Sequence, residues 1–80
     1  MSFTIEDLIR VAREATGDPR LTLREDMSAD DVPLWDSLNH TIITMAIAAE
    51  YGVPLTPKRL GEARTFGELI AVVNQAIDAG

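Results

Sequence analysis

The 80-residue sequence contains no cysteine, which excludes a disulfide framework, a thiolate metal site and a cysteine nucleophile. At this length, the stability of the fold has to come from packing alone. The sequence also lacks any apolar run that approaches the length of a membrane span. Its amino terminus has no basic segment followed by an apolar stretch. We therefore expect a cytoplasmic protein without membrane insertion.

Basic residues are few. Seven lysines and arginines stand against thirteen acidic residues, so the net charge is -6. This sign repels nucleic acid, which is not expected as a partner, and it favours partners with basic patches. The same balance is also typical of small domains that charge keeps soluble. With 46% hydrophobic and 25% charged residues, residues 1–80 are expected to form a single globular domain with a small core.

Hydrophobic spacing and capping residues predict an all-α fold. Thr4 is a good N-cap with Asp7 three residues later, and Gly17 ends the first apolar pattern. Thr65 and Glu68 have the spacing of a capping box before the last pattern. The predicted helices span residues 4–16, 37–51, 57–60 and 65 to about 79.

A long connection, residues 18–36, joins the first two helices. Apolar residues interrupt it often enough to hold it on a helical core: Leu21, Leu23, Met27, Val32, Leu34 and Trp35. A short strand at residues 21–23 is the alternative, but no second strand is available to pair with it. Trp35 either anchors the end of this connection or gates the site that follows.

The run Trp35-Asp36-Ser37-Leu38 marks the start of the second helix. Asp36 is expected to cap this helix, and Ser37 to be its first residue. A hydroxyl there projects into solvent beside helix-terminal N–H groups and the positive end of the helix dipole, which suits a phosphate ester. Leu38 is interpreted chiefly as a core residue that locks the helix start.

The order of these elements, with the segment DSLNHTIITMAIAAEYGVPL and the downstream GEARTFGELIAVV, resembles the acyl carrier proteins over almost the whole chain. The resemblance implies a four-helix bundle with a long first loop and a short third helix. It implies that Ser37 carries a covalent 4′-phosphopantetheine arm, with Asp36 and Leu38 as supporting motif residues. The arm's thiol would hold an acyl, aminoacyl or polyketide group as a thioester.

The second helix departs from the pattern of fatty-acid carriers, which usually show several acidic residues there. Residues 38–51 carry only one charge, Glu50. An apolar docking face is predicted instead, at Asn39, Ile42, Ala46 and Ala49, with Ala48 beside it. This favours dedicated partners in a specialised or secondary pathway, although Ile42 could instead belong to the core.

Two other groups of residues could in principle form a site. Ser37 and His40 share a helix face next to Asp36, but one helical turn rarely supplies an oriented base together with an oxyanion hole, so a hydrolytic triad is rejected. The acids of the long connection fit no EF-hand spacing, and a solvated loop is favoured over a cation site. These acids are Glu25, Asp26, Asp30 and Asp31.

The sequence thus predicts a stand-alone, monomeric carrier without catalytic activity and without a metal. The resemblance implies three kinds of partner: a phosphopantetheinyl transferase, an acyl-loading ligase or acyltransferase, and a ketosynthase or other acyl-accepting enzyme. The alternative is a four-helix interaction module that is never modified and that scaffolds or regulates a partner enzyme. Modification of Ser37 distinguishes the two hypotheses.

Overall fold

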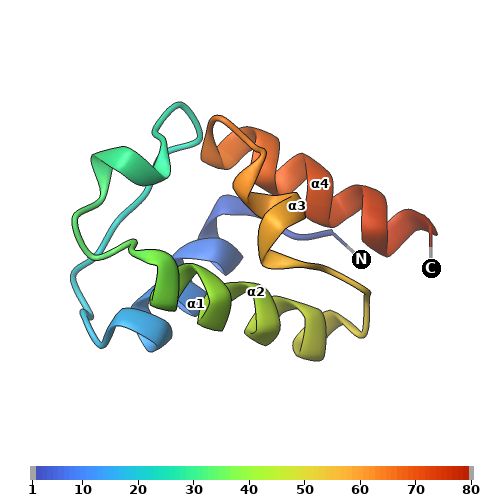
Figure 1. Cartoon of the computed structure of the whole chain (residues 1–80), viewed down its shortest axis with the longest axis horizontal. Helices are drawn as coiled ribbons and strands as arrows, with labels where there is room; N and C mark the ends of the chain where they lie inside the picture. Colours follow the sequence, from blue (N-terminus) through green and yellow to red (C-terminus); the bar gives the residue numbers. More distant parts are fainter. Residues whose placement is uncertain (1, 80) are drawn as a thin grey trace.

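A computed structural model describes residues 2–79 of the chain, and within them the fold is all-α (Figure 1). It contains four α-helices and one short 3₁₀ helix, in the order α1 (Ile5–Thr16), η1 (Ala29–Asp31), α2 (Ser37–Tyr51), α3 (Pro57–Gly61) and α4 (Phe66–Ala79). The four predicted α-helices are therefore confirmed, including the short third one. The described residues contain no strand, so the alternative at residues 21–23 is wrong.

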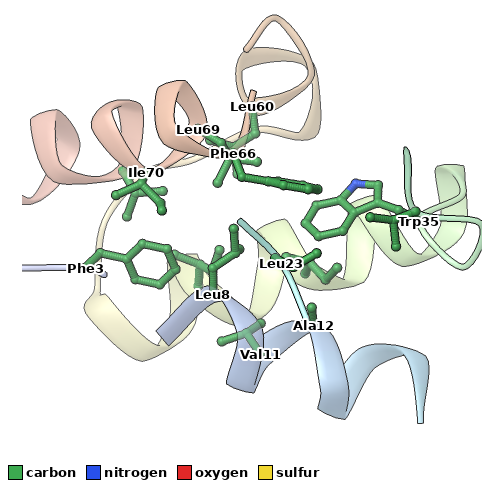
Figure 2. Packing of buried hydrophobic residues seen from close by; sticks show 14 of the residues in the cluster. Phe3, Leu8, Val11, Ala12, Leu23, Trp35, Leu60, Phe66, Leu69 and Ile70 are labelled. Carbon is green, nitrogen blue, oxygen red and sulfur yellow. The ribbon is translucent and has the colours of Figure 1, made fainter. Parts of the chain in front are cut away.

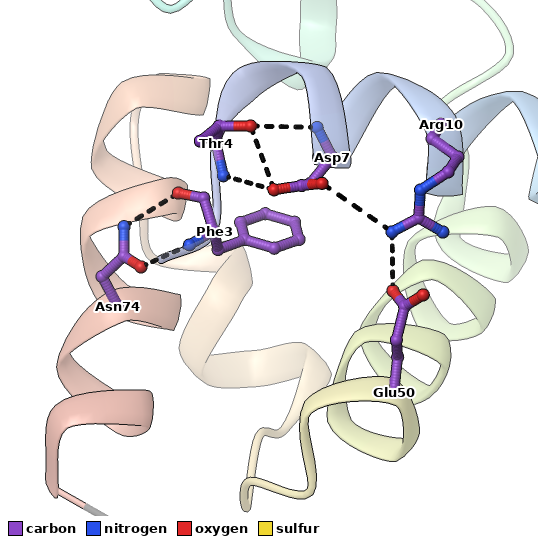
Figure 3. Close-up of polar contacts among 6 residues, drawn as sticks. All are labelled: Phe3, Thr4, Asp7, Arg10, Glu50 and Asn74. Atoms are coloured by element: carbon purple, nitrogen blue, oxygen red, sulfur yellow. Dashed lines mark hydrogen bonds and ion pairs between the residues drawn. The ribbon is translucent and has the colours of Figure 1, made fainter. Parts of the chain in front are cut away.

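Local capping explains where the first two helices begin and end. Thr4 and Asp7 form a capping box at the start of α1, in which each side chain accepts a hydrogen bond from the other residue's backbone N–H (Figure 3). Gly17 and Gly52 follow α1 and α2 with φ angles of 75° and 64°. Residues with a Cβ rarely adopt this left-handed conformation, and both helices end at the residue before a glycine.

The helices enclose one hydrophobic core. Helix α1 packs against α2 and α4, and α3 lies between α2 and α4 (Figure 1). Figure 2 shows side chains of α1, α3 and α4 meeting in this core, and the same cluster includes Ile43 and Ile47 of α2. Its fully buried members include Phe3, Leu8, Ile43, Ile47, Leu60, Phe66 and Val73. Polar contacts add to this packing at the edge of the core, where the Asn74 side chain both accepts from Phe3 N and donates to Phe3 O (Figure 3).

The long connection packs against the core over much of its length. Leu21, Leu23, Val32 and Trp35 are buried, as predicted, and Met27 is half-buried. Leu34 is the exception. It is 44% exposed, so the prediction that it anchors the connection is wrong. The neighbouring Trp35 turns inward instead and lies against Phe66, with ring centroids 4.8 Å apart (Figure 2).

The connection also caps α4. Backbone N–H groups of Phe66 and Gly67 donate to the carbonyl oxygens of Met27 and Glu25, both at 2.9 Å. These amides belong to the first turn of α4, where an α-helix supplies no partner of its own. A Cβ on Gly67 would lie 3.2 Å from Glu25 O, so this close approach favours glycine. The long connection is thereby tied to the first turn of α4.

None of the helices in residues 2–79 is long and apolar enough to cross a bilayer.

Candidate functional site

Asp36 and Ser37 open α2 in the predicted arrangement. The Asp36 carboxylate accepts a hydrogen bond from Asn39 N at 2.8 Å, which makes Asp36 the N-cap. Ser37 is the first helical residue, and its side chain is exposed. Its hydroxyl therefore stands in solvent at the positive end of a fifteen-residue helix.

Two further hydrogen bonds fix the backbone around Ser37. The Asn39 side chain donates from Nδ2 to Leu34 O at 2.8 Å, which holds the end of the long connection against the first turn of α2. Thr41 Oγ1 donates to Ser37 O at 3.0 Å. Asn39 is half-buried and uses its amide within the chain. Its role here is to shape the helix start, whereas the sequence suggested only a docking role.

His40 lies at the centre of a bridge between three segments. Its Nδ1 accepts a hydrogen bond from Trp35 Nε1 at 3.0 Å, and its Nε2 lies 2.8 Å from Pro57 O. An indole N–H only donates and a carbonyl only accepts. Both contacts are therefore satisfied by one form of the ring, the neutral tautomer with its proton on Nε2. Neither contact was predicted from the sequence, where His40 was weighed only as a member of a hydrolytic triad.

A pocket of about 360 Å³ opens beside Ser37, between α2, α3 and the start of α4. Its lining combines the exposed polar residues Asp36 and Ser37 with buried apolar residues, which are Leu60, Phe66 and Leu69. The lining residues include Asp36, Ser37, His40, Thr41, Pro57, Leu60, Gly61, Phe66 and Leu69. No side-chain nitrogen or oxygen buried within residues 2–79 lacks a hydrogen-bond partner. The pocket therefore demands no polar ligand, and its inner wall suits an apolar group.

Leu38 is not a core residue. Its side chain is 69% exposed, so the prediction that it locks the helix start by burial is wrong. Ile42 and Met45 follow it one and two turns later, and they are 40% and 65% exposed. Leu38, Ile42 and Met45 share one face of α2 by their spacing. We call these three residues the exposed apolar stripe.

The sequence could not distinguish this stripe from the core face because both are apolar. Ile43, Thr44 and Ile47 are the buried residues of α2, and Ile42 and Met45 of the stripe lie directly beside them in the sequence. Of the residues predicted for docking, Ile42, Ala46 and Ala49 are exposed, whereas Asn39 and the neighbouring Ala48 are half-buried. The structure thus leaves Ile42 outside the core and adds Leu38 and Met45 to the exposed residues of α2.

The arrangement does not assemble a hydrolytic triad. Both ring nitrogens of His40 are engaged by Trp35 and Pro57, and the Asp36 carboxylate accepts from Asn39 N. In a triad the base would face Ser37 and the carboxylate would face the base.

The acids of the long connection are not gathered into a metal site. Asp31 accepts from Ser28 N at 3.0 Å, and Asp26 forms an exposed ion pair of 3.2 Å with Arg24. Across residues 2–79, no three side chains of His, Cys, Asp or Glu are grouped so that they could hold a metal ion.

The helix order, the long packed connection and the short α3 together define the acyl-carrier-protein fold. The chain is similar to the solution NMR structure of the holo acyl carrier protein from Geobacter metallireducens, with a TM-score of 0.81. Sequence identity is 24%, and the match covers 95% of this chain and 87% of that chain. No protein-family model matches the sequence, and no curated protein matches it significantly. The resemblance seen in the sequence is therefore confirmed at the level of the fold.

Proposed function

We propose that this chain is a carrier protein whose Ser37 holds a 4′-phosphopantetheine arm. The observation that carries the proposal is the position of Ser37. It is exposed on the first turn of α2, in a chain with the acyl-carrier-protein fold, next to a pocket with an apolar inner wall. Likeness to a structure described as holo adds support, because a holo carrier holds its prosthetic group.

The residues present fit such an arm. Ser37 offers an exposed hydroxyl, and the first turn of α2 places helix-terminal N–H groups near the phosphate that the hydroxyl would bear. The chain has no cysteine, so it has no thiol of its own. The arm would supply a terminal thiol that holds an acyl group as a thioester.

Attachment would be a phosphoryl transfer to Ser37. The Ser37 oxygen loses its proton and forms a phosphodiester bond to the pantetheine phosphate of coenzyme A. The diphosphate bond of coenzyme A breaks, and adenosine 3′,5′-bisphosphate leaves. A separate transferase would catalyse this step, because the neighbouring side chains of Asp36 and His40 are already engaged in structural hydrogen bonds.

The carrier would act without catalysis of its own, as a monomer in the cytoplasm. Its partners would be the transferase, an acyl-loading ligase or acyltransferase, and a ketosynthase or other acyl-accepting enzyme. Each of these must approach Ser37, and the residues it meets there include the exposed apolar stripe. Between Ser37 and Ala49 the helix carries no acidic or basic side chain other than His40. This supports partners in a specialised pathway, whose docking surface is apolar rather than basic.

Mass spectrometry of the intact protein tests the proposal directly. The purified chain is incubated with coenzyme A and a promiscuous phosphopantetheinyl transferase, and it should gain the mass of one arm. Ser37→Ala should remain folded and gain nothing. Ser28→Ala is the matched control, since Ser28 lies at the start of a helix, as the N-cap of η1, but outside the motif. This variant should be loaded like the natural chain.

The exposed apolar stripe also supports a second candidate function. An unmodified module that scaffolds or regulates a partner enzyme would use the same three residues without the arm. Failure of the natural chain to gain mass, with a known carrier loaded in the same reaction, would overturn the carrier proposal and favour this module.

A further inference from the structure

The bridge through His40 connects the site to α3, the shortest α-helix in residues 2–79. Helix α3 has five residues, and of these only Leu60 has a buried side chain. Its backbone bonds are long, with Leu60 N to Thr56 O at 3.2 Å and Glu62 N to Arg59 O at 3.4 Å. A helix of this length is not stable by itself in water. Its position must therefore come from contacts with the rest of the chain.

His40 supplies such a contact on the side of the pocket. Its Nε2–H donates to Pro57 O at the first residue of α3, while Trp35 holds the other side of the ring. The α3 backbone also approaches the ring closely, since a Cβ on Gly61 would lie 3.5 Å from His40 Nε2. All four of these residues line the pocket beside Ser37. One ring thus joins the end of the long connection, α2 and α3 around one opening.

We propose that His40 is a positioning residue that holds α3 against α2, so that the pocket beside Ser37 is formed before any group is loaded. What enters the pocket depends on the proposed function, because that group would be carried on Ser37. The positioning of α3 by His40 does not depend on the proposed function and can be tested in the unmodified protein. A preformed pocket binds its occupant without a further ordering cost.

Amide hydrogen exchange in the unmodified protein measures how strongly His40 stabilises the position of α3. His40→Leu removes both hydrogen bonds, of which the one to Pro57 O reaches α3. Exchange at Leu60 in α3, and at Ala63 directly after it, should become roughly 3- to 10-fold faster, the factor expected for one net hydrogen bond. Exchange in α1, at Val11 and Ala12, should stay unchanged. His40→Gln should restore slow exchange in α3, because its amide offers both an acceptor for Trp35 and a donor for Pro57.

Asn39→Ala is the matched control. Asn39 is adjacent to His40, and its side chain donates to Leu34 O of the long connection at 2.8 Å. The substitution removes this hydrogen bond, which does not reach α3. Exchange in α3 should stay at the natural rate. Unchanged exchange in His40→Leu, or equal acceleration in Asn39→Ala, would overturn the proposal.

The natural protein provides a measurement that needs no variant. The ¹⁵N shifts of the His40 ring near neutral pH should show the tautomer protonated on Nε2, as the two contacts require. A ring protonated on Nδ1, or one averaging between tautomers, would overturn the bridge even if His40→Leu failed to fold.

Loading with an octanoyl group tests the second half of the proposal. In the natural chain, α3 exchange should change by less than about twofold on loading, because α3 is already held. In His40→Leu, the octanoyl group should slow α3 exchange several-fold, because it would order a helix that has lost its hold. A several-fold slowing in the natural chain would show that the pocket is not preformed. If Ser37 accepts no arm while the unmodified protein behaves as expected, the carrier function fails and the hold on α3 stands.

Discussion

Replacement of Asp36 separates its structural role from a role in recognition. Asp36→Ala removes the carboxylate that accepts from Asn39 N at 2.8 Å at the start of α2. Loss of an N-cap costs about 0.5–2 kcal/mol of stability, and because Asp36 is exposed, water can partly replace the acceptor. We therefore expect a loss near the middle of this range, about 1 kcal/mol. For a domain of this size, that lowers the thermal midpoint by about 4–8 °C.

Asp36→Asn provides the matched variant. Its amide oxygen can still accept from Asn39 N, so most of the lost stability should return, apart from the few tenths of a kcal/mol that a charge near a helix N-terminus contributes. Urea unfolding followed by circular dichroism measures both variants, and the slope of the free energy against urea should stay unchanged. Natural stability in Asp36→Ala would refute the cap. Equal losses in both variants would assign the effect to charge instead of the hydrogen bond.

The same pair of variants tests recognition by the transferase. If the enzyme contacts the Asp36 carboxylate, Asp36→Asn should be loaded slowly although its fold is intact. Loading rates can be compared by intact mass against time at one transferase concentration. Loading of Asp36→Asn at the natural rate would show that Asp36 serves the helix start alone.

Three further predictions follow from exposure and charge. Ile42→Glu should change the free energy of unfolding by no more than about 0.5 kcal/mol while weakening transfer of the acyl group to a cognate partner enzyme. Ile43→Ala, at a buried position, should instead cost about 2–5 kcal/mol of stability. Unfolding by Ile42→Glu, or unaffected transfer, would contradict an apolar docking face. With a net charge of -6, the thermal midpoint in scanning calorimetry should rise from dilute buffer to moderate salt, and a constant or falling midpoint would show that repulsion does not limit stability. Burial, with the Asp7 and Glu50 carboxylates, raises the pKa of Tyr51 above its ordinary value of 10.0. Above about pH 10 the unfolded state therefore binds fewer protons than the folded state, and the free energy of unfolding should fall as the pH rises. Tyr51→Phe should show a smaller fall. Identical dependence of the unfolding free energy on pH in both proteins would exclude a contribution from Tyr51.

The ends of the helices were predictable from the sequence because capping is local. The Thr4 and Asp7 side chains lie three residues apart and form their reciprocal bonds within one turn. The glycines after α1 and α2 adopt a left-handed conformation that other residues rarely adopt. Asp36 caps α2 through a residue three positions away, which also places Ser37 on the first turn. The exposed position of the candidate serine was therefore predictable without the fold.

Which face of α2 lies inside the molecule was decided only by the tertiary structure. Leu38 and Ile43 are both large aliphatic residues in an almost uncharged segment, so hydrophobic periodicity does not tell which one is buried. Packing of α1 against α2 selects Ile43 for the core and leaves Leu38 outside.

The tertiary structure also determines the contacts made by backbone carbonyls. His40 reaches Pro57 O across seventeen residues, and Phe66 N donates to Met27 O in the long connection. Every residue offers a carbonyl oxygen, so the sequence contains no signal of which carbonyl will accept. Capping and the site serine were therefore determined by side chains close together in the sequence. The pocket beside Ser37, the bridge through His40 and the anchoring of α4 were decided by the fold that brings distant backbone groups together.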